Sequence, residues 1–403
     1  MTRSIFPSLT QAAIVAALAT AVPSQTVRTV TGSGTALANA VAQANPGDVL
    51  LVQSPGPFLP FHLDKGLTIT GTPYTIQPTQ SHPVRDLTVA VPPGQTATIR
   101  HCLFRTGRWT ETLEQNFGVV SIQTGQVHIE DCDFRSRSAG LTIEAGAVAS
   151  LARSTFTGGY PHAFGSPGGE GLVVDGTAVA TDLTLQGYDA SWPVVTPAPG
   201  LRVRGRFHGQ RVVATGGSGA GQYDGQAGVE AAGAVWLVDC GLHGGARPLN
   251  VIYGGHAVLI TGSVTAQLKR CTLTGESQRR PLVSGPVDLN APLLAALANP
   301  STPQIGQPLA ITMHARPTEL LAVFVTDRLA PSTVPWSAQP VWLAPTAFSL
   351  FVGGGVADPS GMLTIQLGVP NQPSLRGWSL WCLTVGAGSV PLQLGPPVGG
   401  TIE

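Results

Sequence analysis

Apolar positions alternate with polar ones in short runs between residues 97 and 275, and the phase of the alternation changes once inside each run. In the stretch VHIEDCDF, Val127 and Ile129 share one phase, whereas Cys132 and Phe134 share the other. Because successive side chains of a strand point to opposite faces, such a change predicts a bend between two short strands. The pattern occurs seven times, in residues 97–107, 127–136, 149–159, 178–187, 207–217, 235–245 and 266–275.

A further short strand precedes each of these units after the first, and glycine-marked turns separate the strands. One unit cannot bury its own apolar face, whereas a stack of such units can. Three strands in every turn of a repeated winding predict a parallel β-helix, in which equivalent side chains stack about 4.8 Å apart. The inward row should then run through Phe104, Phe134, Phe156, Leu185, Ala214, Leu242 and Leu273, which we interpret as core packing.

One charged row tests this register. At the predicted bend the seven copies carry His101, Asp131, Arg153, Asp182, Arg211, Asp239 and Arg270, so the sign of the charge alternates after the first copy. If the coils stack in register, Asp182 and Asp239 each lie between two arginines, and Asp131 lies between His101 and Arg153. Opposite charges on neighbouring strands are stabilising. A calcium-binding acidic row is the weaker interpretation, because arginines would separate the ligands.

Cysteines recur at the next position of the repeat. Four of the five lie there, namely Cys102, Cys132, Cys240 and Cys271. We interpret them as small, buried, reduced thiols. Disulfides between neighbouring coils, Cys102–Cys132 and Cys240–Cys271, stay open as an alternative, because stacked strands bring Cα atoms within bridging range. Cys382 would then be left without a partner.

Residues 33–53, SGTALANAVAQANPGDVLLVQ, have helical spacing instead, with Leu37, Ala40, Val41 and Ala44 on one face. We expect a short helix here that covers the end of the β-helix, whose backbone groups would otherwise be unpaired. The helix, the PGDVLLV strand and HLDKGLTITG (62–71), followed by stacked coils, resemble the right-handed parallel β-helix proteins of the pectate-lyase-like superfamily over about residues 26–285. The resemblance implies a secreted protein that meets polysaccharide along one long face.

The rest of the chain predicts an exported protein with a second domain. Arg3 and the short apolar run 12–22 are typical of a signal peptide and too short to span a bilayer. Alternating strands near the C-terminus predict a small β-sandwich, similar to C-terminal modules of exported bacterial proteins. We divide the chain into signal peptide, β-helix, linker or short helix, and sandwich at residues 1–24, 25–285, 286–303 and 304–403. The predicted fold is all-β: a right-handed parallel β-helix with an N-terminal helix cap, followed by a β-sandwich.

The composition of the chain limits the kinds of partner that we expect it to bind. Charged residues make up 11% of the chain and the net charge is zero, so nothing in the charge favours nucleic acid. After the N-terminal run, no segment is long and apolar enough for a transmembrane helix. We expect a protein that is secreted or at the cell surface, and its oligomeric state stays open.

Long loops follow the repeat in most coils, and stacking should gather them at one vertex. The loops are 108–116, 159–169, 188–199, 217–226, 245–255 and 276–280. Aromatic side chains there suit sugar rings, which predicts substrate contacts at Trp109, Tyr160, Tyr188, Trp192, Tyr223 and Tyr253. The competing interpretation is that the tyrosines stack on each other and pin the loops.

Cleavage of a bound polysaccharide is a separate prediction from binding. Asp189 and Asp224 each follow a tyrosine in successive loops and form the best carboxylate pair for glycoside hydrolysis. For lyase chemistry, His162 or Arg247 would act as the base, with calcium as the cation. The family's usual signatures are missing from the coils: there is no adjacent Asp-Asp pair, no Asn-x-Asp triplet and no Arg-x-Lys. Enzymatic activity, and with it calcium, is therefore left open.

The sequence thus predicts a secreted β-helix protein that binds an extracellular polysaccharide, with a uronate-type polymer as the candidate, along a vertex of stacked loops. Cleavage by a polysaccharide lyase or glycoside hydrolase mechanism is the added option. The alternative is a non-catalytic structural or adhesive protein of the cell surface. No resident metal site and no certain cofactor are predicted.

Overall fold

The computed structural model describes residues 25–79, 86–106, 118–160, 168–190, 195–220, 223–246, 254–275, 281–291, 294–299, 301–327, 329, 341–342, 349–387 and 392–403. The chain divides into two compact units, one over Val27–Ala291 and the other built on Pro292–Glu403. Each unit has its own cluster of buried apolar side chains. Within the described residues, no helix has the length and apolar character needed to cross a membrane.

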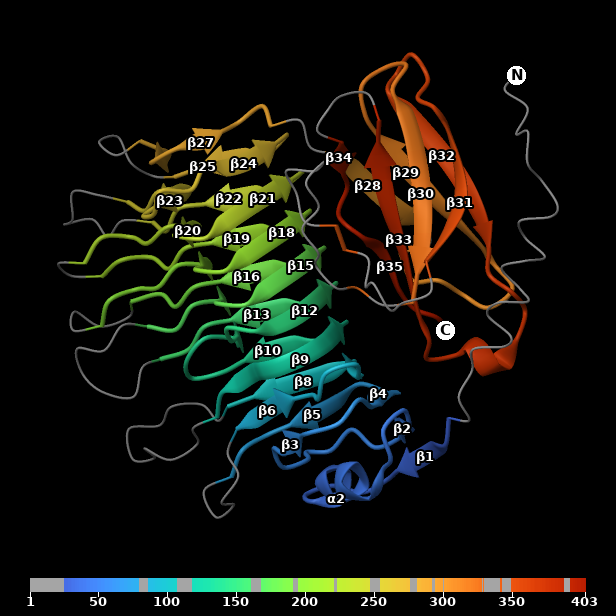
Figure 1. Cartoon of the computed structure of the whole chain (residues 1–403). Helices are drawn as coiled ribbons and strands as arrows, with labels where there is room; N and C mark the ends of the chain where they lie inside the picture. The colour runs from blue at the N-terminus through green and yellow to red at the C-terminus, as the bar shows by residue number, and fades with distance from the viewer. Residues whose placement is uncertain are drawn as a thin grey trace. The chain divides into compact units, whose positions relative to one another are not determined.

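The larger unit is a parallel β-solenoid, in which three ladders of short strands run along the stack of coils (Figure 1). Ladder 1 contains β1 (Val27–Val30), β2 (Val49–Val52), β4 (Thr68–Gly71), β7 (Thr96–Arg100), β9 (Val120–Glu130), β12 (Ala147–Ala152), β15 (Thr177–Thr181), β18 (Arg206–Gln210), β21 (Ala234–Val238), β24 (Ala266–Lys269) and β27 (Val287–Asp288). Ladder 2 contains β3 (His62–Leu63), β6 (Leu87–Ala90), the first part of β9, β11 (Leu141–Ile143), β14 (Leu172–Val174), β17 (Leu201–Val203), β20 (Val229–Ala231), β23 (Val258–Ile260) and β26 (Val283–Ser284).

Ladder 3 is an eight-stranded sheet within the described residues. It contains β5 (Tyr74–Ile76), β8 (Cys102–Arg105), β10 (Asp133–Arg135), β13 (Thr155–Thr157), β16 (Thr184–Gln186), β19 (Val213–Thr215), β22 (Gly241–His243) and β25 (Thr272–Thr274). A typical coil therefore passes from ladder 2 to ladder 1 to ladder 3, as β11, β12 and β13 do. The predicted three strands per coil and their parallel stacking are confirmed.

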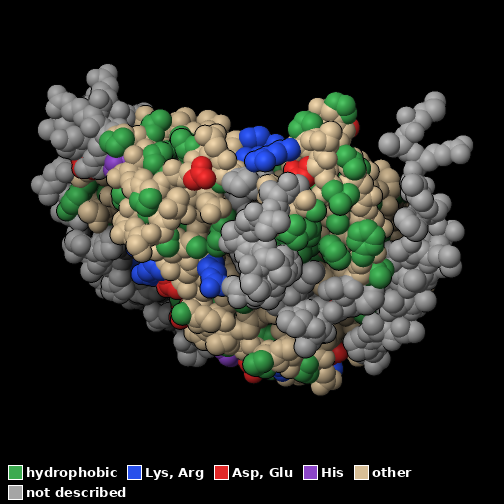
Figure 2. All heavy atoms as spheres, turned by 45° about the horizontal axis from the view of Figure 1, so that its top comes forward, with side chains coloured by type: hydrophobic (Ala, Val, Ile, Leu, Met, Phe, Trp, Pro, Cys, Tyr) green, Lys and Arg blue, Asp and Glu red, His purple; other side chains and the backbone are tan. Residues whose placement is uncertain are grey.

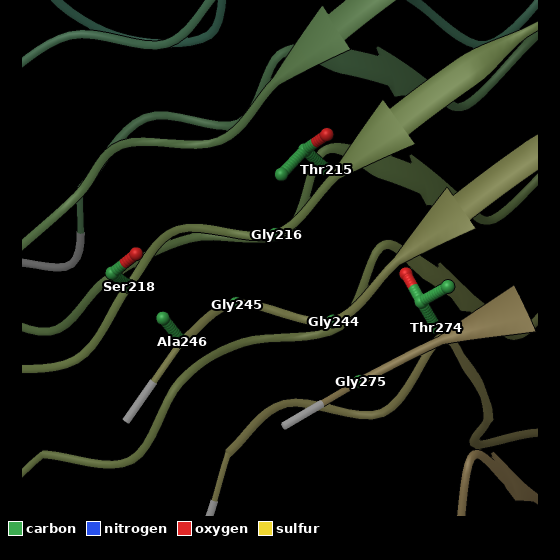
Figure 3. A pocket seen from close by; sticks show the side chains of 8 residues that line it. All are labelled: Thr215, Gly216, Ser218, Gly244, Gly245, Ala246, Thr274 and Gly275. Atoms are coloured by element: carbon green, nitrogen blue, oxygen red, sulfur yellow. The ribbon is translucent and has the colours of Figure 1, made fainter. Parts of the chain in front are cut away.

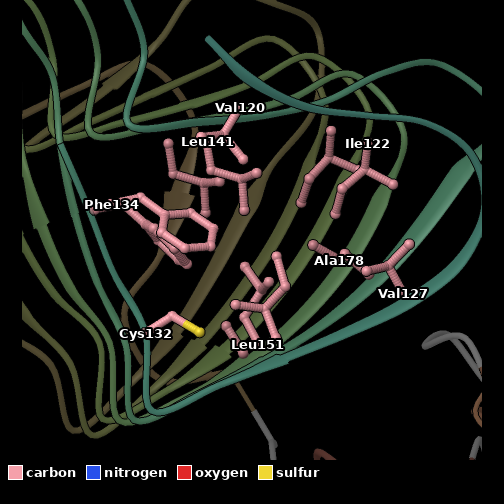
Figure 4. Close-up of a cluster of buried hydrophobic side chains, with 14 of the residues drawn as sticks. Val120, Ile122, Val127, Cys132, Phe134, Leu141, Leu151 and Ala178 are labelled. Atoms are coloured by element: carbon pink, nitrogen blue, oxygen red, sulfur yellow. The ribbon is translucent and has the colours of Figure 1, made fainter. Parts of the chain in front are cut away.

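The interior is filled by the predicted row of apolar side chains. Phe104, Phe134 and Phe156 are register partners in ladder 3, and their ring centroids lie 6.4 and 5.5 Å apart. The row continues in register through Leu185, Ala214, Leu242 and Leu273. Figure 4 shows Phe134 pointing into the same interior as Val120 and Val127, which come from the other two ladders. Each coil thus completes the core of its neighbours.

A residue in the left-handed conformation turns the chain from ladder 1 to ladder 3 in seven successive coils. We call these residues the bend row; φ lies between 44° and 57° at His101, Asp131, Arg153, Asp182, Arg211, Asp239 and Arg270. This explains the change of phase in the sequence, because the bend residue rotates the following side chains by one position. For an L-residue, the left-handed region costs roughly 1 kcal/mol or more, so something else must favour arginine here.

Ion pairs between neighbouring coils stabilise the bend row. The Nε of Arg153 lies 2.9 Å from Oδ1 of Asp131, and Arg211 donates two bonds of 2.6 Å to Asp182. Arg270 binds Asp239 in the same two-pronged way, again at 2.6 Å. Each arginine reaches back to the aspartate of the coil before it, and His101 lies 3.8 Å from the other side of Asp131. The predicted stacking of opposite charges is therefore present.

The predicted helix forms as α2 (Ala36–Gln43). Its side chains Leu37 and Val41 are buried in the solenoid's apolar cluster, next to β1 and β2. The spacing of three to four residues between apolar positions is what places these two side chains on one face.

The second unit contains antiparallel sheets. One sheet orders β28 (Ala295–Asn299), β29 (Pro308–His314) and β32 (Met362–Gly368), and the other orders β31 (Ser349–Val356), β30 (Leu320–Thr326), β33 (Ser379–Gly386) and β34 (Gln393–Leu394), with β35 (Val398–Thr401) also pairing with β33. A 3-10 turn, η1 (Pro373–Leu375), precedes β33. Side chains from both sheets, such as Ile311 and Val323, share one buried cluster.

One expectation about this region was wrong. Residues 286–303 were expected to form a linker or a short helix, but Ala295–Asn299 is the strand β28, which pairs with β29. The solenoid also continues to β27, beyond the predicted end at residue 285. Alanine-rich composition favours a helix locally, and pairing with a neighbouring strand outweighs that preference here.

Candidate functional site

The long loops leave each coil between ladder 3 and ladder 2, and their stems line up along one side of the solenoid (Figure 1). Four outgoing stems donate a backbone hydrogen bond of 2.9 Å to the next coil, each from the glycine that ends the repeat. The bonds run from Gly158 to Gln186, from Gly187 to Thr215, from Gly216 to His243 and from Gly244 to Thr274. We call this glycine-rich side, residues 158–160, 187–190, 216–220 and 244–246 with their returning stems, the loop edge. The predicted gathering of the loops at one vertex holds for these described stems.

Within each loop, the outgoing and returning stems are also joined. Gly169 donates to the carbonyl of Gly159 at 2.9 Å, and Gln226 donates to that of Gly217 at 3.0 Å. Glycine is required because the backbones approach so closely. A Cβ atom on Gly217 would overlap the carbonyl oxygen of Tyr188, and one on Gly255 would overlap that of Gln226. The base of each loop is therefore a tightly packed, mostly backbone surface.

An open cavity of about 320 Å³ lies on the loop edge (Figure 3). It spans the ends of three consecutive strands of ladder 3, β19, β22 and β25. Small residues line it throughout: Thr215, Gly216, Ser218, Gly244, Gly245, Ala246, Thr274 and Gly275. Its polar groups are three hydroxyls and glycine backbone, with His243 Nδ1 bonded to the hydroxyl of Thr274 at 2.5 Å. Such a lining suits a ligand rich in hydroxyl groups.

Two of the predicted aromatic contacts meet at the loop edge. The rings of Tyr160 and Tyr188 pack edge to face with centroids 5.7 Å apart, and both side chains are half-buried. This contact agrees with the competing interpretation that tyrosines pin the loops, while each ring keeps some exposed surface. Tyr223 lies in the next loop and is half-buried too. Its role as a substrate contact stays a prediction.

The predicted carboxylate pair lies on the same edge. Asp189 is exposed, and its Oδ1 accepts a 2.6 Å hydrogen bond from the backbone N–H of Ser218. Ser218 belongs to the loop that also carries Asp224, which is half-buried. The two acids therefore sit on loops that are bonded to each other, and their catalytic role stays a prediction. The remaining predicted site residues, Trp109, His162, Trp192, Arg247 and Tyr253, lie outside the described residues.

A polar network on ladder 1 was not anticipated from the sequence. His128 Nδ1 lies 2.8 Å from Ser150 Oγ, and its Nε2 lies 3.0 Å from Oε2 of the buried Glu130. Arg100 and Arg153 form ion pairs with the same carboxylate. Burial opposes ionisation of Glu130, but the hydrogen bond and charge of His128 and the two guanidinium charges outweigh it, so the pKa lies far below the usual range.

The network has the order hydroxyl, imidazole, carboxylate, which also occurs in serine hydrolases. Catalysis of that kind needs free N–H groups to stabilise an oxyanion, but those of β9 and β12 are engaged in the ladder on both sides. We therefore assign the network a structural role. The signal in the sequence was the outward phase of VHIE, in which His128 and Glu130 alternate with two inward residues.

No cluster of candidate metal ligands appears in the described parts of the chain. Among those residues, no group of three or more His, Cys, Asp or Glu side chains is placed to hold a metal ion. Figure 2 shows one face of the molecule, on which the described charged side chains are few and scattered among polar and apolar atoms. The lining of the described cavity itself offers hydroxyl and backbone groups to a ligand.

Comparison with known proteins adds little to this geometry. No family model matches the chain, and no curated protein matches it in sequence. Among solved structures, full-length tailspike protein 2 from an Escherichia coli O157:H7 bacteriophage is similar with a TM-score of 0.31 and 10% identity, over 90% of this chain and 62% of that chain. The enzymatically active domain of tailspike protein 2 of bacteriophage CBA120 has a TM-score of 0.24 and 10% identity, over 95% of this chain and 71% of that chain.

These likenesses are too weak to carry an argument about fold or function. The chain also spans only 62% of the length of the full-length tailspike protein. What can be said of the site therefore comes from the chain's own residues: a glycine-packed edge, a hydroxyl-lined cavity, and nearby tyrosines and acids on bonded loops.

Proposed function

We propose that the chain binds an extracellular polysaccharide along the loop edge of its solenoid. The observation that carries this proposal is the 320 Å³ cavity over three consecutive coils, lined by the hydroxyls of Thr215, Ser218 and Thr274 and by glycine backbone. Sugars present many hydroxyls, which pair with such groups. A binding surface repeated from coil to coil also suits a polymer whose own units repeat.

Aromatic and charged residues of the vertex loops would complete the proposed site. Tyr160, Tyr188 and Tyr223 would offer ring faces to sugar C–H groups, together with Trp192 from the loop of Tyr188 and with Trp109 and Tyr253 from two other long loops of the sequence. Arg247 follows the lining residue Ala246 directly in the chain, and a guanidinium binds a carboxylate well. A uronate-type polymer therefore remains the candidate ligand.

Cleavage of the polymer is the added option within this proposal. Asp189 and Asp224 lie on loops joined through the Ser218 N–H bond and are the candidate pair for hydrolysis. His162 or Arg247 would serve as base in a lyase mechanism, with calcium as the cation. A carboxylate that accepts a hydrogen bond from a packed loop stem is held in place, as either role requires.

The proposal also includes the handedness of the solenoid, its N-terminal cap, the fold of the second unit and the export of the chain. We infer that the solenoid is a right-handed β-helix over about residues 25–291, whose first coil is covered by α2 through the buried Leu37 and Val41. The antiparallel sheets of the second unit, β28 included, share one apolar cluster, which supports a β-sandwich over about residues 294–403. Residues 1–24 are proposed to be an export signal, so the protein would act outside the cell or at its surface.

Affinity electrophoresis of the whole protein in gels containing single polysaccharides tests binding. Replacement of Thr215 and Thr274 by valine keeps the shape of both side chains and removes two hydroxyls from the cavity, so retardation by the bound polymer should fall about fivefold for each hydroxyl lost. Thr157→Val is the matched control, because Thr157 occupies the same register position of ladder 3 outside the cavity lining. Equal retardation of the unchanged protein, the variant with Thr215→Val and Thr274→Val, and the control Thr157→Val would refute the cavity as the site.

A second experiment separates binding from the structural or adhesive alternative and from catalysis. The double variant Tyr188→Ala and Tyr223→Ala should lose retardation, whereas a purely structural protein would show none for the unchanged chain on any polymer. An enzyme would release products with unsaturated-uronate absorbance or new reducing ends. Asp189→Asn and Asp224→Asn should each abolish hydrolysis, and undiminished activity would remove this pair from the mechanism.

A further inference from the structure

Two pairs of cysteines are stacked in neighbouring coils of the solenoid. Cys102 and Cys132 follow the first two residues of the bend row, and Cys240 and Cys271 follow its last two. The strands on either side are in register at both places: Arg100 pairs with Glu130 before the first bend, for example, and Gly241 pairs with Thr272 after the last. Neighbouring strands lie about 4.8 Å apart, which is within the roughly 4.4–6.8 Å between the Cα atoms of a disulfide.

All five cysteines are free thiols in the structure. The stacked geometry nevertheless lets either pair close without a large backbone movement. The two pairs differ in how much of each sulfur reagents can reach and in how readily each thiol ionises.

The first pair is closed off by the core. Cys102 and Cys132 are 0% and 3% exposed, because further strands of ladder 3 lie on both sides of them. The second pair lies at the end of ladder 3. Cys271 directly precedes β25, the last strand of that ladder within the described residues, and is half-buried, whereas Cys240, one coil further in, is 2% exposed.

The pKa values of the thiols also distinguish the two pairs of cysteines. Burial raises the pKa of Cys132 to about 12 and also raises that of Cys102. In the last pair, the hydrogen bond from the Cys240 thiol lowers the pKa of Cys271 against the opposing effect of burial, while burial raises the pKa of Cys240. The accessible sulfur is thus the one that more easily becomes a thiolate, which is the nucleophilic form.

We propose that Cys271 is a thiol-modification site that reacts with small disulfides, such as oxidised glutathione, and that Cys240 resolves the product. In the first step the Cys271 thiolate attacks one sulfur of the small disulfide, forms a mixed disulfide and releases one thiolate. In the second step Cys240 gives up its proton and attacks Sγ of Cys271, which forms the Cys240–Cys271 disulfide and releases the second small thiol. Two protein thiols are oxidised and one small disulfide is reduced to two thiols.

The full-length protein, incubated with oxidised glutathione and then trapped with acid and alkylated, tests this assignment by mass spectrometry of its peptides. The unchanged protein should form the Cys240–Cys271 disulfide, while Cys102, Cys132 and Cys382 stay reduced until the chain is unfolded. The variant Cys240→Ala should stop at the first step and accumulate glutathione on Cys271. The variant Cys271→Ser should take up no glutathione.

Direct alkylation with iodoacetamide keeps the test independent of disulfide closure. Cys271 should react at least about tenfold faster than Cys132, and its rate should reach half-maximum at a lower pH than an ordinary thiol. Cys132→Ser is the matched control and should leave the reaction of Cys271 unchanged. Equal labelling of the two stacked pairs, or glutathione on Cys240 in Cys271→Ser, would overturn the proposal.

Discussion

The bend row and the loop edge solve the same problem, a sharp change of direction in every coil, in opposite ways. At the bend row the backbone takes the left-handed conformation that favours glycine, yet the residues are aspartate, arginine and one histidine. On the loop edge the loop stems are rich in glycine, yet four of these glycines have ordinary negative φ or extended backbone: Gly158, Gly187, Gly216 and Gly244.

The comparison separates two physical reasons for choosing a residue. Unfavourable φ is a local cost of roughly 1 kcal/mol, and an ion pair between coils offsets part of it, so arginine is tolerated at the bend. Overlap of a Cβ atom with a neighbouring backbone cannot be offset by any side chain, so only glycine fits at positions such as Gly217 and Gly255 of the loop edge. The bend row is therefore stabilised by contacts between side chains, whereas the loop edge is stabilised by close packing of the backbone.

The strongest test of the bend side is Glu130→Gln. Arg153 of the bend row and Arg100 would lose the buried carboxylate that neutralises them, and the free energy of unfolding should fall by about 3–5 kcal/mol in urea melts at neutral pH. Glu144→Gln, on an exposed carboxylate, is the matched control and should change it by less than about 0.5 kcal/mol. If both variants lost equally little, the ion pairs would not hold the bends.

The loop edge is tested by Gly217→Ala. The added methyl group would overlap the carbonyl oxygen of Tyr188, so urea melts should show a loss of about 3 kcal/mol together with weaker polysaccharide retardation. Gly241→Ala is the control, because the nearest atom to its Cβ, at 3.1 Å, belongs to the movable side chain of His243. That variant should change stability by less than about 1 kcal/mol. Similar losses at both positions would show that close backbone approach is not what selects glycine.

Lowering the pH is a further test of the bend side, because the buried His208 and Glu130 belong to ladder 1, which leads into the bends. Burial lowers the pKa of His208 to about 4, so the unfolded chain takes up a proton below about pH 6.5 while the folded chain does not. Stability should therefore fall by about 3 kcal/mol as pH drops from about 6.5 to 4. Melting curves of His208→Phe should lack this dependence, and Glu130, whose folded pKa is depressed, should add a further loss only below about pH 4.3. An unchanged slope in His208→Phe would contradict the assignment.

The smallest effect is expected when Arg270→Gly is compared with Arg270→Ala. Both variants lose the exposed pair with Asp239, which contributes less than about 1 kcal/mol. Glycine also relieves the φ of 53° at this position, and alanine does not. Arg270→Gly should therefore be more stable than Arg270→Ala by about 1 kcal/mol in parallel urea melts, while equal values would mean that the conformation carries no cost here.

Much of the solenoid could be predicted from the sequence because each coil repeats the same local rule. The change of phase at Asp131 located a bend, and the repeat located its partners in other coils. The rows through Phe134 and through Arg211 follow from stacking alone. The antiparallel unit has no such repeat, and strand β28 was mistaken for a linker, since its pairing with β29 depends on residues elsewhere in the chain.

Some contacts on the loop edge follow from the stacking of the coils. Stacking of the loops placed Tyr160 beside Tyr188 and joined the loops of Asp189 and Asp224. The cavity could not be predicted, because it is formed by what small residues leave empty across three coils. The link between His128 and Ser150 was missed for a similar reason: the two are 22 residues apart and meet only through the register of β9 and β12.

The sequence by itself determined the period, the inward rows and the order of charges along the bends, because each of these is a property of position within a repeated unit. Tertiary structure alone decided which glycines are indispensable, which thiol is accessible at the end of the stack and where the loop edge is hollow. Those properties depend on the distance between atoms of different coils, and spacing along the chain does not encode that distance.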